Sequence, residues 1–191
     1  QDCEVTSAHV GAVEALLREG VSGKHVVLPC SLEVWREFDA LVIRSAGRAQ
    51  TSYSLEITSG SDVEAGGFVF TLARGLLSDV LASFIAQVRQ VQEATGRNWM
   101  AVALDDQVLP DRLVIRSRFP GERAQITGHC RTIKLKNLMI DHKIPSSRRT
   151  TWPVVATPDG EYIWSPGLPP AVEFAAHAET KALATLRATA I

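Results

Sequence analysis

Basic side chains gather in one part of this chain, between residues 111 and 149. Ten lysines and arginines stand there against three carboxylates, a local net charge of +7, although the whole chain carries −1 and the remainder therefore −8. Such asymmetry is typical of a protein that binds a polyanion. The alternative is an ordinary solvated face whose cations pair with carboxylates. Our candidates for phosphate contacts are Arg116, Arg118, Arg123, Lys134, Lys136, Lys143, Arg148 and Arg149.

The spacing of the arginines suits contact with a phosphate group. Arg116 and Arg118 are two residues apart in a predicted strand, which places them on the same face of a sheet. Two guanidinium groups on one face can grip a phosphate bidentately, whereas a cross-strand ion pair with Asp or Glu is the alternative. Arg148 and Arg149 lie among small hydroxyl side chains in a predicted loop. Such a loop is a good phosphate grip, unless it is only an exposed turn.

Two of the lysines, Lys134 and Lys136, lie within a predicted short helix over 133–142, and Lys143 comes directly after it. Pro145 prevents this helix from continuing. On a helix Lys134 and Lys136 would point about 200° apart, so they would straddle a phosphate ridge rather than share one ligand. Lys143 could reach the same surface.

The elements that must position these cations alternate between strands and a few helices. The hydrophobic periodicity predicts an α+β fold with mixed or antiparallel sheets. We expect helices at 8–19 (with Ser7 as its cap), 76–95 and 133–142, strands at 25–28, 32–37, 40–44, 51–58, 67–73, 99–104, 112–118, 152–156 and 161–164, and a strand followed by a helix within 171–188.

A small, polar stretch at 45–50 predicts a linker. We therefore divide the chain into a first domain over 1–48 and a second over 49–191. The helix over 76–95 is expected to cover one face of a sheet, with a dimer contact as the alternative.

The length and composition of the chain indicate a globular protein. With 191 residues, 46% of them hydrophobic and 21% charged, the chain suits one large or two small globular domains. No run approaches the roughly 18–20 apolar residues of a membrane span. Because Cys3, Cys30 and Cys130 are odd in number and far apart, we expect neither a disulfide framework nor a zinc site, which fits a cytoplasmic protein. A chain that starts with Gln1 is expected to be a piece of a longer protein.

Two segments carry a family resemblance. Residues 131–168 read RTIKLKNLMIDHKIPSSRRTTWPVVATPDGEYIWSPGL, and residues 116–123 read RSRFPGER. Their order of KLK, K-x-P, twin arginines, DG turn and W-x-PG, behind R-x-R-x-PG-E-R, resembles the C-terminal domain of tRNA(Ile)-lysidine synthetase. Residues 9–44 resemble, with a less specific motif, the end of that family's middle substrate-recognition domain.

The resemblance implies the function of a parent enzyme. That ligase uses ATP and Mg to adenylate the wobble cytidine of a tRNA(Ile) with a CAU anticodon, and then joins lysine to it. The part in hand would be its tRNA-binding portion, with the second domain on the acceptor stem and the eight cations above as tRNA contacts. The partners implied are tRNA(Ile) and the N-terminal ATPase domain of the same enzyme, without a membrane and with a homodimer as a further option.

The chemistry itself is expected to lie outside this chain. The chain contains neither a GxxxxGK[ST] loop nor the SGGxDS-like segment with which lysidine synthetases hold ATP. We therefore predict no catalytic residue, no metal ligand and no cofactor site here.

The competing hypothesis is a protein-interaction or assembly domain without RNA contact. The two differ in whether the cations form one surface or are dispersed in ion pairs. The chain also departs from the family at Ile133 and Pro169, where the family usually has basic residues. Both departures are expected to remove an RNA contact. Trp152 and Trp164 are expected to pack in the interior rather than stack on bases.

Overall fold

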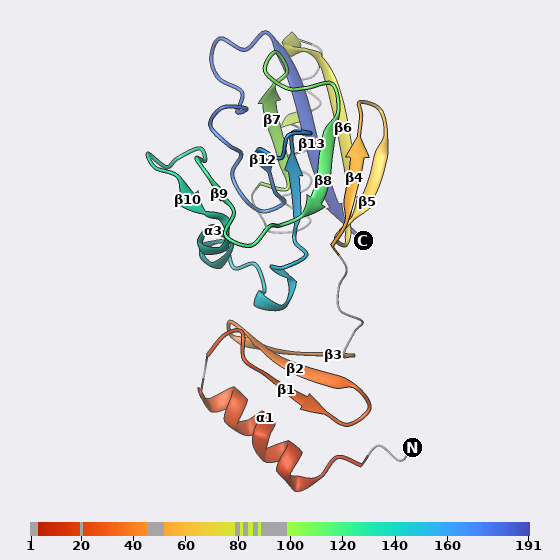
Figure 1. The fold of residues 1–191 in the computed structure, drawn as a ribbon, viewed down its shortest axis with the longest axis vertical. Coiled ribbons are helices and arrows are strands. Elements are labelled where there is room, and N and C mark those ends of the chain that lie inside the picture. Colours follow the sequence, from red (N-terminus) through yellow and green to blue (C-terminus); the bar gives the residue numbers. More distant parts are fainter. Residues whose placement is uncertain are drawn as a thin grey trace.

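The computed structural model describes residues 4–19, 21–45, 52–78 and 99–191, and the single positions 81, 84, 85 and 88. These residues form an N-terminal unit (4–45) and a C-terminal unit (52–191), which lie one above the other in Figure 1. Every strand pair is antiparallel. The predicted α+β class is confirmed. No helix in these ranges is long and apolar enough to cross a bilayer.

The N-terminal unit is one helix beside a three-stranded meander. Its elements are α1 (Ser7–Glu19), β1 (His25–Leu28), β2 (Leu32–Glu37) and β3 (Ala40–Ser45). The strand order is β1-β2-β3, so each turn joins neighbouring strands. The predicted strands are confirmed, but α1 already includes Ser7, so the prediction that Ser7 caps the helix from outside is wrong. Cys30, in the β1–β2 turn, is disulfide-bonded, so the expectation that the chain has no disulfide framework was wrong for this residue.

The C-terminal unit contains two four-stranded sheets. The first has the order β12-β11-β8-β4 and the second the order β5-β6-β13-β7. The strands of the first sheet are β4 (Ser54–Ile57), β8 (Leu113–Ser117), β11 (Pro153–Ala156) and β12 (Tyr162–Trp164). Those of the second are β5 (Asp62–Ala65), β6 (Phe68–Leu76), β7 (Ala101–Asp105) and β13 (Ala182–Ala190). Three small elements stand beside them: β9 (Arg123–Ala124) with β10 (Ile133–Lys134), helix α3 (Leu135–Asp141), and the 3-10 helix η1 (Ser146–Arg148).

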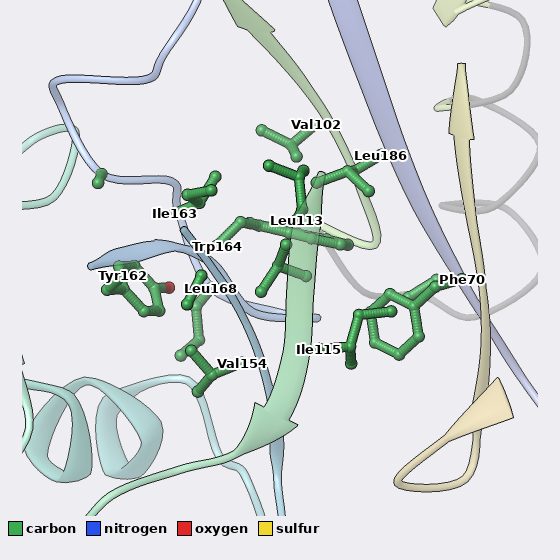
Figure 2. Packing of buried hydrophobic residues seen from close by; sticks show 14 of the residues in the cluster. Phe70, Val102, Leu113, Ile115, Val154, Tyr162, Ile163, Trp164, Leu168 and Leu186 are labelled. Atoms are coloured by element: carbon green, nitrogen blue, oxygen red, sulfur yellow. The ribbon is translucent and has the colours of Figure 1, made fainter. Parts of the chain in front are cut away.

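A single hydrophobic core joins the two sheets. Phe70 from β6, Ile115 from β8 and Trp164 from β12 converge in it (Figure 2), and all three are fully buried. The Phe70 and Trp164 rings meet edge to face at 6.3 Å, a favourable geometry for an aromatic pair. Every residue of this cluster belongs to the C-terminal unit, whereas in the N-terminal unit only Leu16 and Val34 are buried hydrophobic residues among those described.

Two predictions about these elements were wrong, and others fall outside the described residues. The segment expected to be a turn before β6 contains β5, which pairs with β6 across the Gly66-Gly67 turn. The predicted helix over 133–142 begins only at Leu135, so Lys134 belongs to β10. The linker at 45–50, and with it the domain boundary between 48 and 49, lies almost entirely outside the described residues, as does most of the predicted helix over 76–95.

The C-terminal tail is the largest correction. Instead of a strand followed by a helix, its last element is the nine-residue strand β13, which lies between β6 and β7. Its alanines and leucines favour helix in isolation. A central strand with both neighbours paired satisfies its backbone groups on both edges, so tertiary pairing overrides that propensity.

Candidate nucleic-acid interface

The ribbon formed by β9 and β10 places two cations directly opposite each other. Arg123 is the register partner of Lys134, and both side chains are exposed. Side chains opposite each other on paired strands lie about 5 Å apart at Cβ, and like charges in that position destabilise the pair. Within the described ranges neither side chain forms an ion pair. An external anion would relieve this repulsion.

Helix α3 extends the positive charge beyond the ribbon. Its buried side, which includes Leu138 and Met139, packs on the core, while Lys136 in its first turn is exposed. Arg131, in the loop that leads into β10, is exposed as well. We call these four side chains the cationic ribbon: Arg123, Arg131, Lys134 and Lys136. Figure 1 shows their elements, β9, β10 and α3, together on one side of the C-terminal unit.

Lys143 stands at the other end of α3. It follows the helix with a φ of +55°, donates its backbone N–H to the Ile140 carbonyl and exposes its side chain. Its charge is therefore available, although it lies a helix length away from the cationic ribbon.

Arg116 is the buried half of an ion pair. It is only 4% exposed. Its Nη2 lies 2.6 Å and its Nη1 3.3 Å from the two carboxylate oxygens of Glu122. Nη2 also donates to the Gly160 carbonyl at 3.0 Å, and the guanidinium lies 3.9 Å from the centroid of the Phe119 ring. These contacts use both Nη groups inside the protein. Arg116 therefore forms an ion pair with a glutamate, as the alternative named for it held, although Glu122 lies in a loop and not on a neighbouring strand.

Arg118 does not share a strand face with Arg116, because β8 ends at Ser117. Its Nε donates to the Arg149 carbonyl at 3.0 Å and its Nη1 to the Phe119 carbonyl at 2.9 Å. Arg118 thus ties the loop after β8 to the residue that follows η1.

The twin arginines also point inward. Arg148 donates from Nη2 to the Gly66 carbonyl at 3.0 Å, and its guanidinium lies 5.0 Å from the Trp152 ring centroid. Arg149 donates from Nε to the Ile144 carbonyl at 2.7 Å. Both side chains are partly buried. The loop predicted as a phosphate grip therefore braces the interior of the protein.

The structure thus separates the eight predicted side chains into two groups. Four are exposed, namely Arg123, Lys134, Lys136 and Lys143; four are engaged by other parts of the chain, namely Arg116, Arg118, Arg148 and Arg149. Arg131 is an exposed cation that the prediction left out. Arg131 is one of the ten cations counted in the basic segment, but its exposure became evident only in the folded chain.

The tryptophans behave as predicted. Trp152 and Trp164 are buried, and the Trp152 indole N–H donates to the Pro166 carbonyl at 3.0 Å. Nearby, burial raises the pKa of Tyr53 to about 12, so its hydroxyl stays neutral and donates to the Thr151 carbonyl. These contacts hold the loop of the twin arginines against the core.

The two departures from the family pattern are parts of the packing. Ile133 is half-buried and packs against the core, and Pro169 is buried while its carbonyl accepts a hydrogen bond from the Tyr162 hydroxyl at 3.3 Å. In the part of the chain that the structure describes, no three His, Cys, Asp or Glu side chains could hold a metal ion together.

Comparison with known proteins shows what this region is similar to. Residues 113–186, which contain the cationic ribbon and core strands, match the family described as TilS substrate C-terminal domain. The resemblance predicted from the two sequence motifs is confirmed.

Relatives and a solved structure agree with this assignment. A tRNA(Ile)-lysidine synthase of Geobacillus kaustophilus is 30% identical over 165 residues, which are 86% of this chain and 33% of the relative. One of Oceanobacillus iheyensis is 41% identical over 76 residues, which are 40% of this chain and 16% of the relative. This chain thus spans about a third or less of these relatives. A crystal structure of a TilS C-terminal domain superimposes with a TM-score of 0.56 at 23% identity, covering 74% of this chain and 98% of the other, which shows the shared fold.

Proposed function

We propose that this chain is the tRNA-binding C-terminal portion of a tRNA(Ile)-lysidine synthase and that the cationic ribbon holds phosphates of the tRNA. The observation that carries the proposal is the opposed pair Arg123 and Lys134, two exposed cations with no ion-pair partner among the described residues. A phosphate between them would turn a repulsive pair into a bridged one. RNA duplexes are held mainly through their backbone and shape, so exposed cations on a ribbon suit the task.

The parent activity belongs to the same proposal. The parent would be the ATP-dependent ligase that the family resemblance implies, which joins lysine to the wobble cytidine of tRNA(Ile) in the cytoplasm, and the relatives named tRNA(Ile)-lysidine synthase support this. ATP and Mg would bind in a part of the enzyme outside this chain, and this chain would contribute by holding the substrate. Arg116 is left out of the proposed contacts because its guanidinium is committed to Glu122.

The salt dependence of tRNA binding tests the proposal. Each phosphate neutralised by a cation contributes about 0.7–0.9 to the slope of log affinity against log salt. Because one phosphate would lie between Arg123 and Lys134, replacing both with alanine should lower the slope by about 0.7–0.9 and weaken tRNA(Ile) and an unrelated tRNA alike. Filter binding at several salt concentrations measures both quantities.

Arg112→Ala is the matched control. Arg112 is an exposed cation too, but it lies at the opposite end of β8 and pairs with Glu56 at 3.5 Å. Its removal should leave the slope unchanged. If the double variant keeps the parent slope, the ribbon does not hold phosphates. If the parent chain binds no tRNA even at low salt, the competing hypothesis of a protein-interaction domain is favoured, and sedimentation would then test for a homodimer.

A further inference from the structure

A buried carboxylate connects the two units of the chain. Glu37, the last residue of β2, is only 5% exposed although it belongs to the small N-terminal unit. Its partners are 109 and 110 residues away, at the start of η1. The Ser146 N–H donates to Oε2 at 2.8 Å and the Ser147 N–H to Oε1 at 2.9 Å. The Ser146 hydroxyl lies 3.1 and 3.2 Å from the same two oxygens.

Glu37 therefore caps a helix that belongs to the other unit. The residue before η1 is Pro145, and it provides no side-chain cap for the helix. The first N–H groups of a helix need an acceptor, and a carboxylate makes stronger hydrogen bonds to them than a neutral group does. Burial raises the pKa of Glu37, but the hydrogen bonds from Ser147 and Ser146 outweigh burial and leave the pKa below its ordinary value. The group is thus a carboxylate at neutral pH.

The backbone around Glu37 is shaped for this contact. Phe38, the next residue, has a φ of +54° and donates its N–H to the Ser22 hydroxyl at 3.0 Å. Gly23 has a φ of +93°, and a Cβ added there would lie 3.1 Å from the Ser146 hydroxyl oxygen. The turn that contains Gly23 and the turn that begins at Phe38 thus lie close to η1, and a side chain at position 23 would crowd Ser146.

The contact continues from η1 toward the cationic ribbon. Arg149, directly after η1, accepts at its carbonyl the hydrogen bond from Arg118. Arg118 stands in the loop that leads from β8 to Arg123 in β9. A chain of hydrogen bonds and short loops therefore joins Glu37 to the base of the ribbon, and Figure 1 shows the segment between α3 and β11 reaching toward the N-terminal sheet.

We propose that Glu37 is a positioning residue that fixes the orientation of the N-terminal unit relative to the cationic ribbon. The inference rests on the proposed function, because a fixed orientation serves to present bound tRNA to the remainder of a longer ligase. Without the carboxylate, the units would lose their hydrogen bonds to Glu37 and keep weaker contacts such as the Arg149 guanidinium 5.9 Å from the Phe38 ring centroid. Part of the binding free energy would then be spent on orienting the two units.

Pulsed electron–electron double resonance on the 191-residue chain tests the geometry. One spin label goes on Cys130, which is free and exposed, and the other on Gly11→Cys in α1, where an added Cβ meets no atom within 4 Å. The parent pair should give one narrow distance distribution, and Glu37→Ala should broaden it. Glu33→Ala is the matched control, because Glu33 also lies in β2 but bonds only within its own unit, to Trp35 and Arg44. It should leave the distribution narrow.

The functional readout uses the full-length ligase. Glu37→Ala should raise KM for tRNA roughly five-fold, the lower range for coupling between two sites, while KM for ATP and the salt slope of tRNA binding stay unchanged. Glu37→Gln, which keeps one acceptor oxygen, should lie between. Distributions of equal width in parent and Glu37→Ala, or an unchanged KM for tRNA, would overturn the proposal. A parent chain that binds no tRNA would instead remove the proposed function, while the distance measurement would still decide the role of Glu37 in the structure.

Discussion

Replacing Arg116 with methionine should destabilise the C-terminal unit strongly. The substitution removes the partner of Glu122, whose side chain is 9% exposed. It also removes the donors to the Gly160 and Ser117 carbonyls. Glu122 would keep a bond from the Phe119 N–H at 3.0 Å, which compensates only part of a buried charge.

The expected magnitude follows from that burial. Removing one partner of a buried ion pair costs about 3–5 kcal/mol, because the other charge stays uncompensated. A domain has only about 5–15 kcal/mol of unfolding free energy, so much of the stability would be lost. At roughly 2–4 °C per kcal/mol for a chain of this size, the midpoint of thermal unfolding should fall by about 6–20 °C.

Urea unfolding of the parent, Arg116→Met, Glu122→Leu and the double variant measures this coupling. The double variant should recover most of the loss, since replacing both charges with apolar groups is often neutral or better. A loss below about 1 kcal/mol for Arg116→Met, or strictly additive effects of the two substitutions, would refute the buried-pair argument. In folded Arg116→Met protein the salt slope of tRNA binding should match the parent.

Three further outcomes are expected. Gly66→Ala should cost more than Gly60→Ala, because both glycines have positive φ but only at Gly66 would the new Cβ lie 2.5 Å from the Tyr53 hydroxyl; we expect about 1–2 kcal/mol at Gly60 and about 1–3 kcal/mol more at Gly66, and equal urea midpoints would contradict this. Since the folded-state pKa of Glu37 lies below its ordinary value of 4.5, its stabilisation is complete above that value and is lost as the pH falls through the folded pKa. The difference in unfolding free energy between parent and Glu37→Gln should thus shrink in acid, and a pH-independent difference would argue against the assignment. A chain of residues 52–191 should unfold cooperatively by itself, because the whole hydrophobic cluster lies within it; a non-cooperative thermal transition would place the domain boundary elsewhere.

Much of the fold was predictable because its strands are short and patterned. The strands β2, β8 and β11 are short runs rich in β-branched or aromatic residues, and each of them lies where the sequence predicts a strand. The tail was not predictable in this way. The residues of β13 carry a helical propensity, and only pairing on both of its edges makes it a strand.

The candidate site, too, was predictable from the sequence in some respects and not in others. The charge asymmetry and the two motifs were enough to predict the family and the basic segment, because they depend only on the order of residue types. They could not separate Lys134 from Arg116. One is exposed on a ribbon with a like charge opposite, whereas the other is buried against a carboxylate.

The sequence alone therefore determined the α+β class, the family resemblance of the C-terminal region and the segment that carries the positive charge. Tertiary structure decided which cations face solvent, because a guanidinium donates its N–H groups within the protein wherever the fold places carbonyls and carboxylates around it. It also decided the contact of Glu37 with η1, which joins residues 109 and 110 positions apart. Local sequence determines which groups can donate or accept; only the folded chain brings distant donors and acceptors within hydrogen-bonding distance.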